Sequence, residues 1–141
     1  MFFVDTNIVI YAMTRSRYRD PCVRVLEAVA RGHADGRTSV AVLEEIWHLE
    51  LRGSLGELTG LTADVRALFA PVLPVTDDIF GKALGLEVPP QLGANDRVHA
   101  ATCLVAGIPA ILSADVDFED VLGLRRVDPL NEKGLRRLFA G

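Results

Sequence analysis

Acidic residues flank the apolar segments of this chain at several points, and their placement could bring them together. Asp5 comes directly after the apolar segment 2–4, and Asp115 follows closely after the apolar segment 108–112. Asp96 stands at the start of a helical segment that leads into 108–112. In open parallel sheets, ligands bind outside the carboxyl ends of the strands, so Asp5 and Asp115 would lie side by side if their strands are neighbours.

Two adjacent acids, Glu44 and Glu45, lie inside a predicted helical segment, and one of them can turn inward toward the same edge. Carboxylates gathered at one spot repel one another, so such a cluster requires a positive partner. Oxygen-rich sites of this kind select hard cations such as Mg²⁺ or Mn²⁺. Two such ions can activate a water and stabilise the leaving oxygen in phosphodiester cleavage, so the residues favour a metal-assisted hydrolase.

The elements that must position these acids follow from short apolar runs that alternate with longer amphipathic ones. Helices are predicted over 7–14, 18–31, 40–52, 62–70, 77–87, 95–106 and 131–139, and strands over 2–4, 37–39, 72–75, 108–112 and 125–127. Pro74 suits an edge position for the segment 72–75. Strands that alternate with helices favour a parallel sheet covered on both faces, so we predict a three-layer α/β/α domain with about five strands.

Length and composition limit the class of protein. The 141 residues fit one domain over 1–141, and a hydrophobic share of 50% predicts a well-buried core. Cys22 and Cys103 form no recognisable spacing pattern, which favours reduced thiols in a cytosol. Asp5 interrupts the apolar start, which argues against a signal peptide, and no uncharged run is long enough to span a bilayer. We therefore expect a soluble, cytoplasmic protein.

The net charge of -4 is unusual for a protein that binds nucleic acid, because a basic balance is the common footprint. The basic residues nevertheless cluster near the two ends, as Arg15, Arg17, Arg19 and Arg24, and as Arg125, Arg126, Lys133, Arg136 and Arg137. Cations bound by an acidic site would also reverse the local sign. Nucleic-acid contact and solvated helix surface both stay open as explanations of the clusters.

Two other classes that place an aspartate at a strand end fit this sequence poorly. A phosphoacceptor switch of the response-regulator type needs an acidic pair after the first strand, where Thr6 and Asn7 follow Asp5, and a lysine late in the sheet. Lys133 lies instead in the last predicted helix. A haloacid-dehalogenase phosphatase needs a second aspartate two residues after the first, at the position of Asn7.

Four motifs stand in order along the chain: Val-Asp-Thr-Asn at 4–7, Ser-Val-Ala-Val-Leu-Glu-Glu-Ile at 39–46, Asn-Asp-Arg-Val-His-Ala-Ala at 95–101 and Ile-Leu-Ser-Ala-Asp-Val-Asp-Phe at 111–118. Together they resemble the PIN-domain family, and especially the VapC toxins of toxin–antitoxin pairs. The resemblance covers nearly the whole chain. It implies an endoribonuclease that uses Mg²⁺ or Mn²⁺ to cleave RNA phosphodiester bonds, forms a homodimer, and pairs with a small antitoxin whose C-terminal segment occupies the catalytic groove.

Carried over by position, the catalytic and metal-binding acids of the family fall on Asp5, Glu45, Asp96 and Asp115. Glu45 is preferred to Glu44 because it stands six residues after Ser39 and directly before an apolar residue. A catalytically silent PIN-like module that binds RNA or protein is the alternative. The presence of all four acids favours activity over that alternative.

Several further residues have two readings. Thr6, Asn7 and Ser113 could orient the acids or act as helix caps and a strand-end hydroxyl, and Asp117 could be an accessory acid or an ordinary loop carboxylate. Arg97 is a candidate RNA phosphate contact, and equally an ordinary exposed residue.

Other side chains are predicted to pack rather than to act. Asp96, His99 and Cys103 share a helical stripe that suggests zinc, but neighbouring alanines indicate a packed helix face. Trp47 and His48 could reach a partner or pack in the core, and packing is preferred. Tyr11 and Tyr18 could stack on a base, but they too are expected to pack. The apolar stretch 8–11, with arginines nearby, is the predicted surface for association with a partner.

Overall fold

The sheet at the centre of the molecule has four strands, all parallel to their neighbours, in the computed structural model, which describes all 141 residues. They are β1 (Phe2–Val4), β2 (Gly36–Arg37), β3 (Ala110–Leu112) and β4 (Arg125–Val127), in the order β2-β1-β3-β4. Val4 pairs with Leu112, so β1 and β3 end at the same level. The residues that follow these two strands therefore meet at one edge of the sheet.

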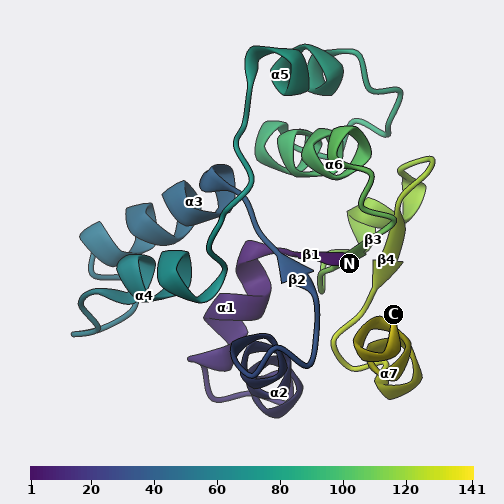
Figure 1. The fold of residues 1–141 in the computed structure, drawn as a ribbon. Helices are drawn as coiled ribbons and strands as arrows, with labels where there is room; N and C mark the ends of the chain where they lie inside the picture. The colour runs from purple at the N-terminus through teal and green to yellow at the C-terminus, as the bar shows by residue number, and fades with distance from the viewer.

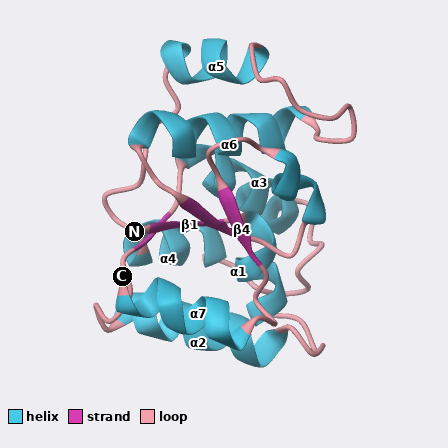
Figure 2. Ribbon diagram, turned by 90° about the vertical axis from the view of Figure 1, so that its right-hand side faces the viewer, coloured by secondary structure: helices cyan, strands magenta, loops and turns pink.

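Helices cover both faces of the sheet. They are α1 (Thr6–Ala12), α2 (Arg19–Ala30), α3 (Val40–Leu51), α4 (Leu61–Leu68), α5 (Asp77–Leu84), α6 (Ala94–Ala106) and α7 (Glu132–Ala140), with a 3-10 helix η1 (Val116–Asp120). Figure 2 shows α2 and α7 below the sheet and α6 above it, with α5 outermost. In Figure 1, α3 and α4 pack together at one side. The layers agree with the predicted α/β/α order.

The predicted strand over 72–75 is absent, so the expectation of about five strands was wrong. Leu73 makes one isolated bridge beside β2, where its N–H donates to the Thr38 carbonyl at 2.9 Å and its carbonyl accepts from the Val40 N–H at 3.0 Å. Pro74 has no N–H to continue the ladder. This segment therefore lies along the edge of the sheet without extending it.

The helix boundaries lie within about three residues of the predicted ones, and polar side chains cap the start of several helices. The Ser39 hydroxyl accepts from the Val42 N–H at 3.4 Å at the start of α3. Thr76 caps α5 by accepting from the Ile79 N–H at 3.3 Å. At the end of α6, Gly107 adopts a φ of 70°, which a glycine tolerates without strain.

The core surrounds β1, whose Phe2 and Phe3 are fully buried between the helical layers. Cys22 and Cys103 are both buried and unpaired, and burial raises the pKa of each thiol, that of Cys22 to about 12. Both therefore stay protonated and pack as small apolar side chains. None of the helices has the length and apolar character that crossing a bilayer requires.

Candidate active site

Four acidic side chains from four parts of the fold line one cavity. Asp5 follows β1 and Asp115 follows β3, while Glu45 lies in α3 and Asp96 in the first turn of α6. Thr6, Asn7, Ile10 and Tyr11, all from α1, complete the lining. The structure thus brings together the four acids that the sequence singled out, and it leaves Glu44 on the exposed side of α3.

Both oxygens of the Asp5 carboxylate are held by hydrogen bonds. Oδ1 accepts from the Thr6 N–H at 2.8 Å, which caps α1, and Oδ2 accepts from the Ser113 hydroxyl at 2.6 Å and from the Asn7 amide at 3.1 Å. Asp5 itself is only 4% exposed. Its orientation is therefore fixed by the protein, while its remaining lone pairs face the cavity.

Asn7 and Ser113 tie the first turn of α1 to the loop after β3. The Asn7 amide donates to the Ser113 hydroxyl at 3.0 Å, and its carbonyl accepts from the Ala114 N–H at 3.3 Å. The Ser113 oxygen also accepts from the Asp115 N–H at 3.0 Å. These bonds fix Asp5 relative to Asp115. The Thr6 hydroxyl is buried and has no hydrogen-bond partner, and Thr6 lines the cavity.

Asp117, a predicted accessory acid, and Arg97, a predicted phosphate contact, do not line the cavity. The Asp117 N–H donates to Asp115 Oδ1 at 2.9 Å, so Asp115 also caps the short helix η1. The Arg97 guanidinium faces the loop before α6, where Nε donates to the Leu92 carbonyl at 2.7 Å and Nη2 to the Pro89 carbonyl at 3.5 Å. In this arrangement, Arg97 holds that loop against α6.

His99 was interpreted from the sequence as part of a packed helix face, but it belongs to the site. It is fully buried, its Nε2 forms a short hydrogen bond with Glu45 Oε1, and the same nitrogen lies 3.9 Å from Asp5 Oδ1. His99 stands three residues after Asp96, so both side chains project from one face of α6. That spacing was the available signal. The position of Glu45 opposite was not visible in the sequence.

Hydrogen-bond chemistry decides what His99 can do here. One potential ligand atom from each of Asp5, Asp96 and His99 lies within 4.8 Å of the others, which is a spacing compatible with a metal ion. A carboxylate only accepts hydrogen bonds, so the His99 Nε2 that faces Glu45 must carry a proton. A protonated nitrogen has no lone pair for a metal. Carboxylate oxygens are therefore the candidate metal ligands in this arrangement, and His99 holds one of the carboxylates in place.

The electrostatics of the cavity favour a cation. Burial, followed by the charge of Asp5 and then that of Asp115, raises the pKa of Asp96 to about 7 against the opposing effect of His99. Burial also raises the pKa of Asp5, although His99, Ser113 and Thr6 lower it. Asp5 and Asp96 are therefore costly to ionise in this cavity. A set of oxygen donors under mutual repulsion matches the ligand preference of Mg²⁺ or Mn²⁺.

Two predictions about apolar surface were wrong. Trp47 was expected to pack, but it is 53% exposed on α3, near the exposed Val40 and Leu51, and lines an apolar groove that adjoins the cavity. Ile8 and Val9, proposed as association surface, are buried in the core of the chain itself. The exposed apolar face is thus on α3, because α1 turns its own apolar side toward β1 and α2.

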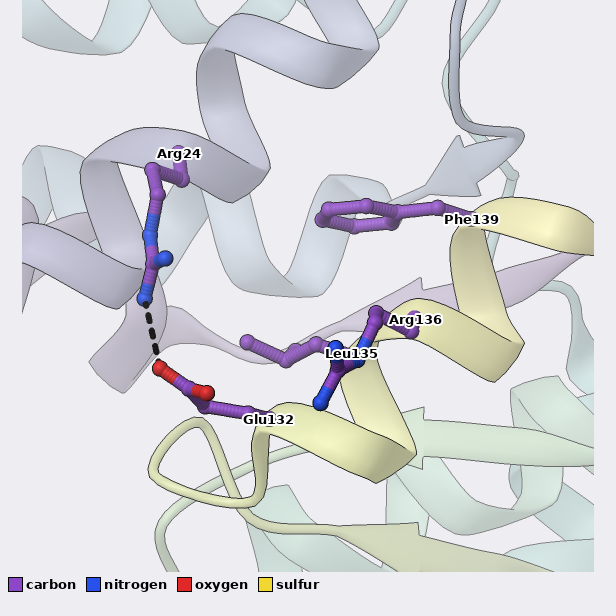
Figure 3. A pocket seen from close by; sticks show the side chains of 5 residues that line it. All are labelled: Arg24, Glu132, Leu135, Arg136 and Phe139. Carbon is purple, nitrogen blue, oxygen red and sulfur yellow. Dashed lines mark ion pairs between the residues drawn. The ribbon is translucent and has the colours of Figure 1, made fainter.

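A second hollow, between α2 and α7, contains no comparable chemistry. Figure 3 shows its five lining residues, Arg24, Glu132, Leu135, Arg136 and Phe139. Arg24 and Glu132 form an ion pair at 3.9 Å with both side chains largely exposed, and such pairs contribute little to stability. This hollow is a surface feature where the C-terminal helix meets α2.

The chain is similar to known proteins in sequence and in fold. The sequence profile of the PIN domain family matches residues 2–124. The chain is 30% identical over 138 residues to Ribonuclease VapC7 of Mycobacterium tuberculosis, which covers 92% of each protein. Its fold is similar to FitAcB from Neisseria gonorrhoeae, with a TM-score of 0.63, 18% identity and coverage of 93% of this chain and 99% of the other. The fold is also similar to VapBC2 from Rickettsia felis, whose structure contains a DNA fragment from its promoter. The TM-score is 0.61 at 16% identity, and the match covers 90% of this chain and 97% of the other.

Proposed function

This chain belongs to the PIN domain family, and we propose on that premise that it is an endoribonuclease which hydrolyses RNA phosphodiester bonds. We further propose that it is the toxin of a VapBC-type toxin–antitoxin pair and depends on Mg²⁺ or Mn²⁺. The observation that carries the proposal is the convergence of Asp5, Glu45, Asp96 and Asp115 on one cavity. A catalytically silent module would have no need to keep four mutually repelling acids in place.

The residues of the chain hold the reacting groups in position. Bound divalent ions would supply a water of lowered pKa and would offset the negative charge that develops on the scissile phosphate. Ser113 and Asn7 fix Asp5 relative to Asp115, and His99 fixes Glu45. Carboxylates that are held before the substrate arrives require little reorganisation during the reaction.

An antitoxin partner fits the same electrostatics. The cavity presents four carboxylates and no basic side chain among its lining residues. A small protein that places a basic side chain there would neutralise the repulsion in the way a metal ion does. Antitoxin and divalent metal would then compete for the carboxylates, which explains how one segment of a partner can silence the enzyme.

The proposed function is tested by two adjacent glutamates on α3. Glu45→Gln is expected to lower RNA cleavage by at least about 100-fold while the protein stays folded, because it removes a metal ligand held by His99. Glu44→Gln is the matched control and should cleave like wild type, because Glu44 is exposed. Cleavage of labelled RNA is followed in Mg²⁺ and in chelator. Full activity in chelator, or equal loss in both variants, would refute the proposal.

A further inference from the structure

A row of three side chains leads away from the acidic cavity toward the start of α2. Tyr11 lines the cavity, and the ring of Tyr18 stacks on it with centroids 4.6 Å apart and planes within 15°. The guanidinium carbon of Arg17 lies 5.3 Å from the centroid of the Tyr18 ring. These three residues, called the aromatic row below, connect the carboxylates to an exposed segment of the surface.

The cavity alone cannot hold a polynucleotide. Its acids repel every phosphate except one that contacts bound metal, so the nucleotides on either side need positive charge elsewhere. Two arginines with polar partners are already engaged: Arg97 donates to loop carbonyls, and Arg126 forms ion pairs with Glu119 and Asp128. The segment that carries the aromatic row instead provides three exposed arginines that form no ion pair, Arg15, Arg17 and Arg19.

The chemistry of the row matches that of a single-stranded nucleotide chain. Stacked aromatic rings bind bases without regard to sequence, and a guanidinium held over a ring can contact a phosphate or stack on a base. The apolar groove on α3 has a different character, because exposed Val40, Trp47 and Leu51 contribute to its lining. That groove suits a protein surface, whereas the aromatic row offers planar rings and unpaired positive charge.

We propose that the aromatic row is the binding site for the RNA nucleotides next to the scissile phosphate, an inference that rests on the proposed nuclease function. Tyr11 and Tyr18 present the stacking surface, and Arg17 contacts a backbone phosphate. The row thereby sets the direction in which the single strand leaves the carboxylates. Both tyrosines pack against the core, as the sequence predicts. Each is also partly exposed, which leaves part of its ring available to a ligand.

The first test measures the salt dependence of RNA binding. A fluorescein-labelled, unstructured RNA of mixed sequence is titrated with the Asp115→Asn protein in Mg²⁺ at several NaCl concentrations, so that cleavage does not interfere. Adding Arg17→Gln should weaken binding and reduce the slope of log affinity against log salt by about 0.7, the value for one phosphate contact on a single strand. The matched control is Arg31→Gln, an exposed arginine at the far end of α2, which should leave the slope unchanged.

The second test separates stacking from charge and from folding. Tyr18→Leu should weaken RNA binding by about tenfold without changing the salt slope, because it removes a ring and no charge. Tyr18→Phe keeps the ring and should bind like its parent. If Tyr18→Leu fails to fold, the Arg17→Gln slope still decides, because that exposed substitution disturbs no buried contact.

Two outcomes distinguish failure of the aromatic row as an RNA site from failure of the nuclease assignment. Arg17→Gln with the affinity and slope of its parent would overturn the aromatic row as an RNA site and would indicate a protein-docking surface, even if wild type cleaves RNA. RNA binding that depends on Arg17 and Tyr18 in a protein without metal-dependent cleavage would support the row and overturn the nuclease.

Discussion

At the scale of single residues, the site depends on how each carboxylate is held. The Asp5 carboxylate accepts hydrogen bonds from two side chains and one backbone N–H. The Glu45 carboxylate has one hydrogen-bond partner, His99. Hydrogen bonds from a second layer of residues commonly control the affinity of a metal site. His99 is thus a positioning residue, and its effect should be visible in metal binding before any RNA is added.

Replacing His99 should weaken the metal site without abolishing it. His99→Ala is expected to lower Mn²⁺ affinity by about 10- to 100-fold, because Glu45 loses the donor that orients it. His99→Gln, whose amide can still donate to Glu45, should retain most of the affinity. Isothermal titration of Mn²⁺ into the folded proteins measures both. Unchanged affinity in a folded His99→Ala protein would contradict the positioning role.

Asp96 predicts a pH dependence with opposite signs for stability and for metal binding. Its pKa is raised from 3.8 to about 7, so the folded protein retains a proton that the unfolded chain releases. The resulting stability is complete below about pH 4 and is lost as the pH rises through about 7. Asp5 acts in the same direction, because its pKa is also raised. Metal binding requires the ionised acids and should therefore strengthen over the same rise in pH.

Thermal melts test both signs. In chelator, wild type should melt higher at pH 5 than at pH 8, and Asp96→Asn should show a smaller difference. Mn²⁺ should stabilise wild type more at pH 8 than at pH 5. Wherever the metal is in hundredfold excess over its Kd, it should raise the free energy of unfolding by about 2.7 kcal/mol. A metal effect that is equal at both pH values would show that Asp96 does not titrate at the site.

At the scale of elements, α2 packs closely against β2 because Gly36 has no side chain. A Cβ added to Gly36 would lie 2.7 Å from Val29 Cγ2 and 3.3 Å from the Phe2 ring, so Gly36→Ala should destabilise the protein by about 1–3 kcal/mol. Gly81 lies in α5 with nothing within 4 Å of an added Cβ, so Gly81→Ala should stabilise it by about 0.5–1 kcal/mol. Urea unfolding measures both changes. If the two substitutions changed the free energy of unfolding equally, α2 and β2 would be able to move apart to accommodate the added methyl group.

Much of the fold was predictable at this scale because its signals are local. Alternating apolar runs and caps such as Ser39 place the helices and indicate four of the strands, although β2 begins one residue earlier than predicted and β3 is shorter. The segment 72–75 carries the same apolar signal as a strand, but Pro74 and the single bridge at Leu73 end its pairing. Whether a short apolar run joins a sheet depends on its neighbour, which sequence periodicity does not contain.

The site was predictable only in part, for a related reason. Asp5 and Asp115 follow strands, which predicts that both lie at the carboxyl edge of the sheet, but only the structure shows that their strands are neighbours. His99 lies among alanines on a buried helix face, and only the approach of Glu45 from α3 distinguishes it from a packing residue. Trp47 was assigned to the core by its apolar character, yet the groove on α3 leaves it exposed.

At the scale of the whole molecule, the exposed apolar face of α3 predicts self-association. We expect a homodimer in which this face is covered by a second copy, since Val40, Trp47 and Leu51 lie together on it. Trp47 is the single tryptophan of the chain, so its emission reports on this surface alone. The emission maximum should move to shorter wavelength as protein concentration rises, in step with the mass from light scattering.

A pair of leucine substitutions identifies the face. Leu51→Glu on α3 should give a monomer with a concentration-independent Trp47 emission, because a charge cannot be buried in the interface without a partner. Leu84→Glu on α5, an equally exposed leucine outside the groove, should associate like wild type. A wild-type monomer at every concentration would contradict the dimer, and a dimer in Leu51→Glu would place its interface elsewhere.

The sheet order has a consequence for how this protein is made. β1 is synthesised long before β3 and the residues that follow β3, although the two strands are neighbours in the folded sheet. A nascent fragment that stops before Ser113 has neither the hydroxyl that orients Asp5 nor the carboxylate of Asp115. Such a fragment cannot form the cavity, so a growing chain has no complete acidic site until the residues that follow β3 have been made.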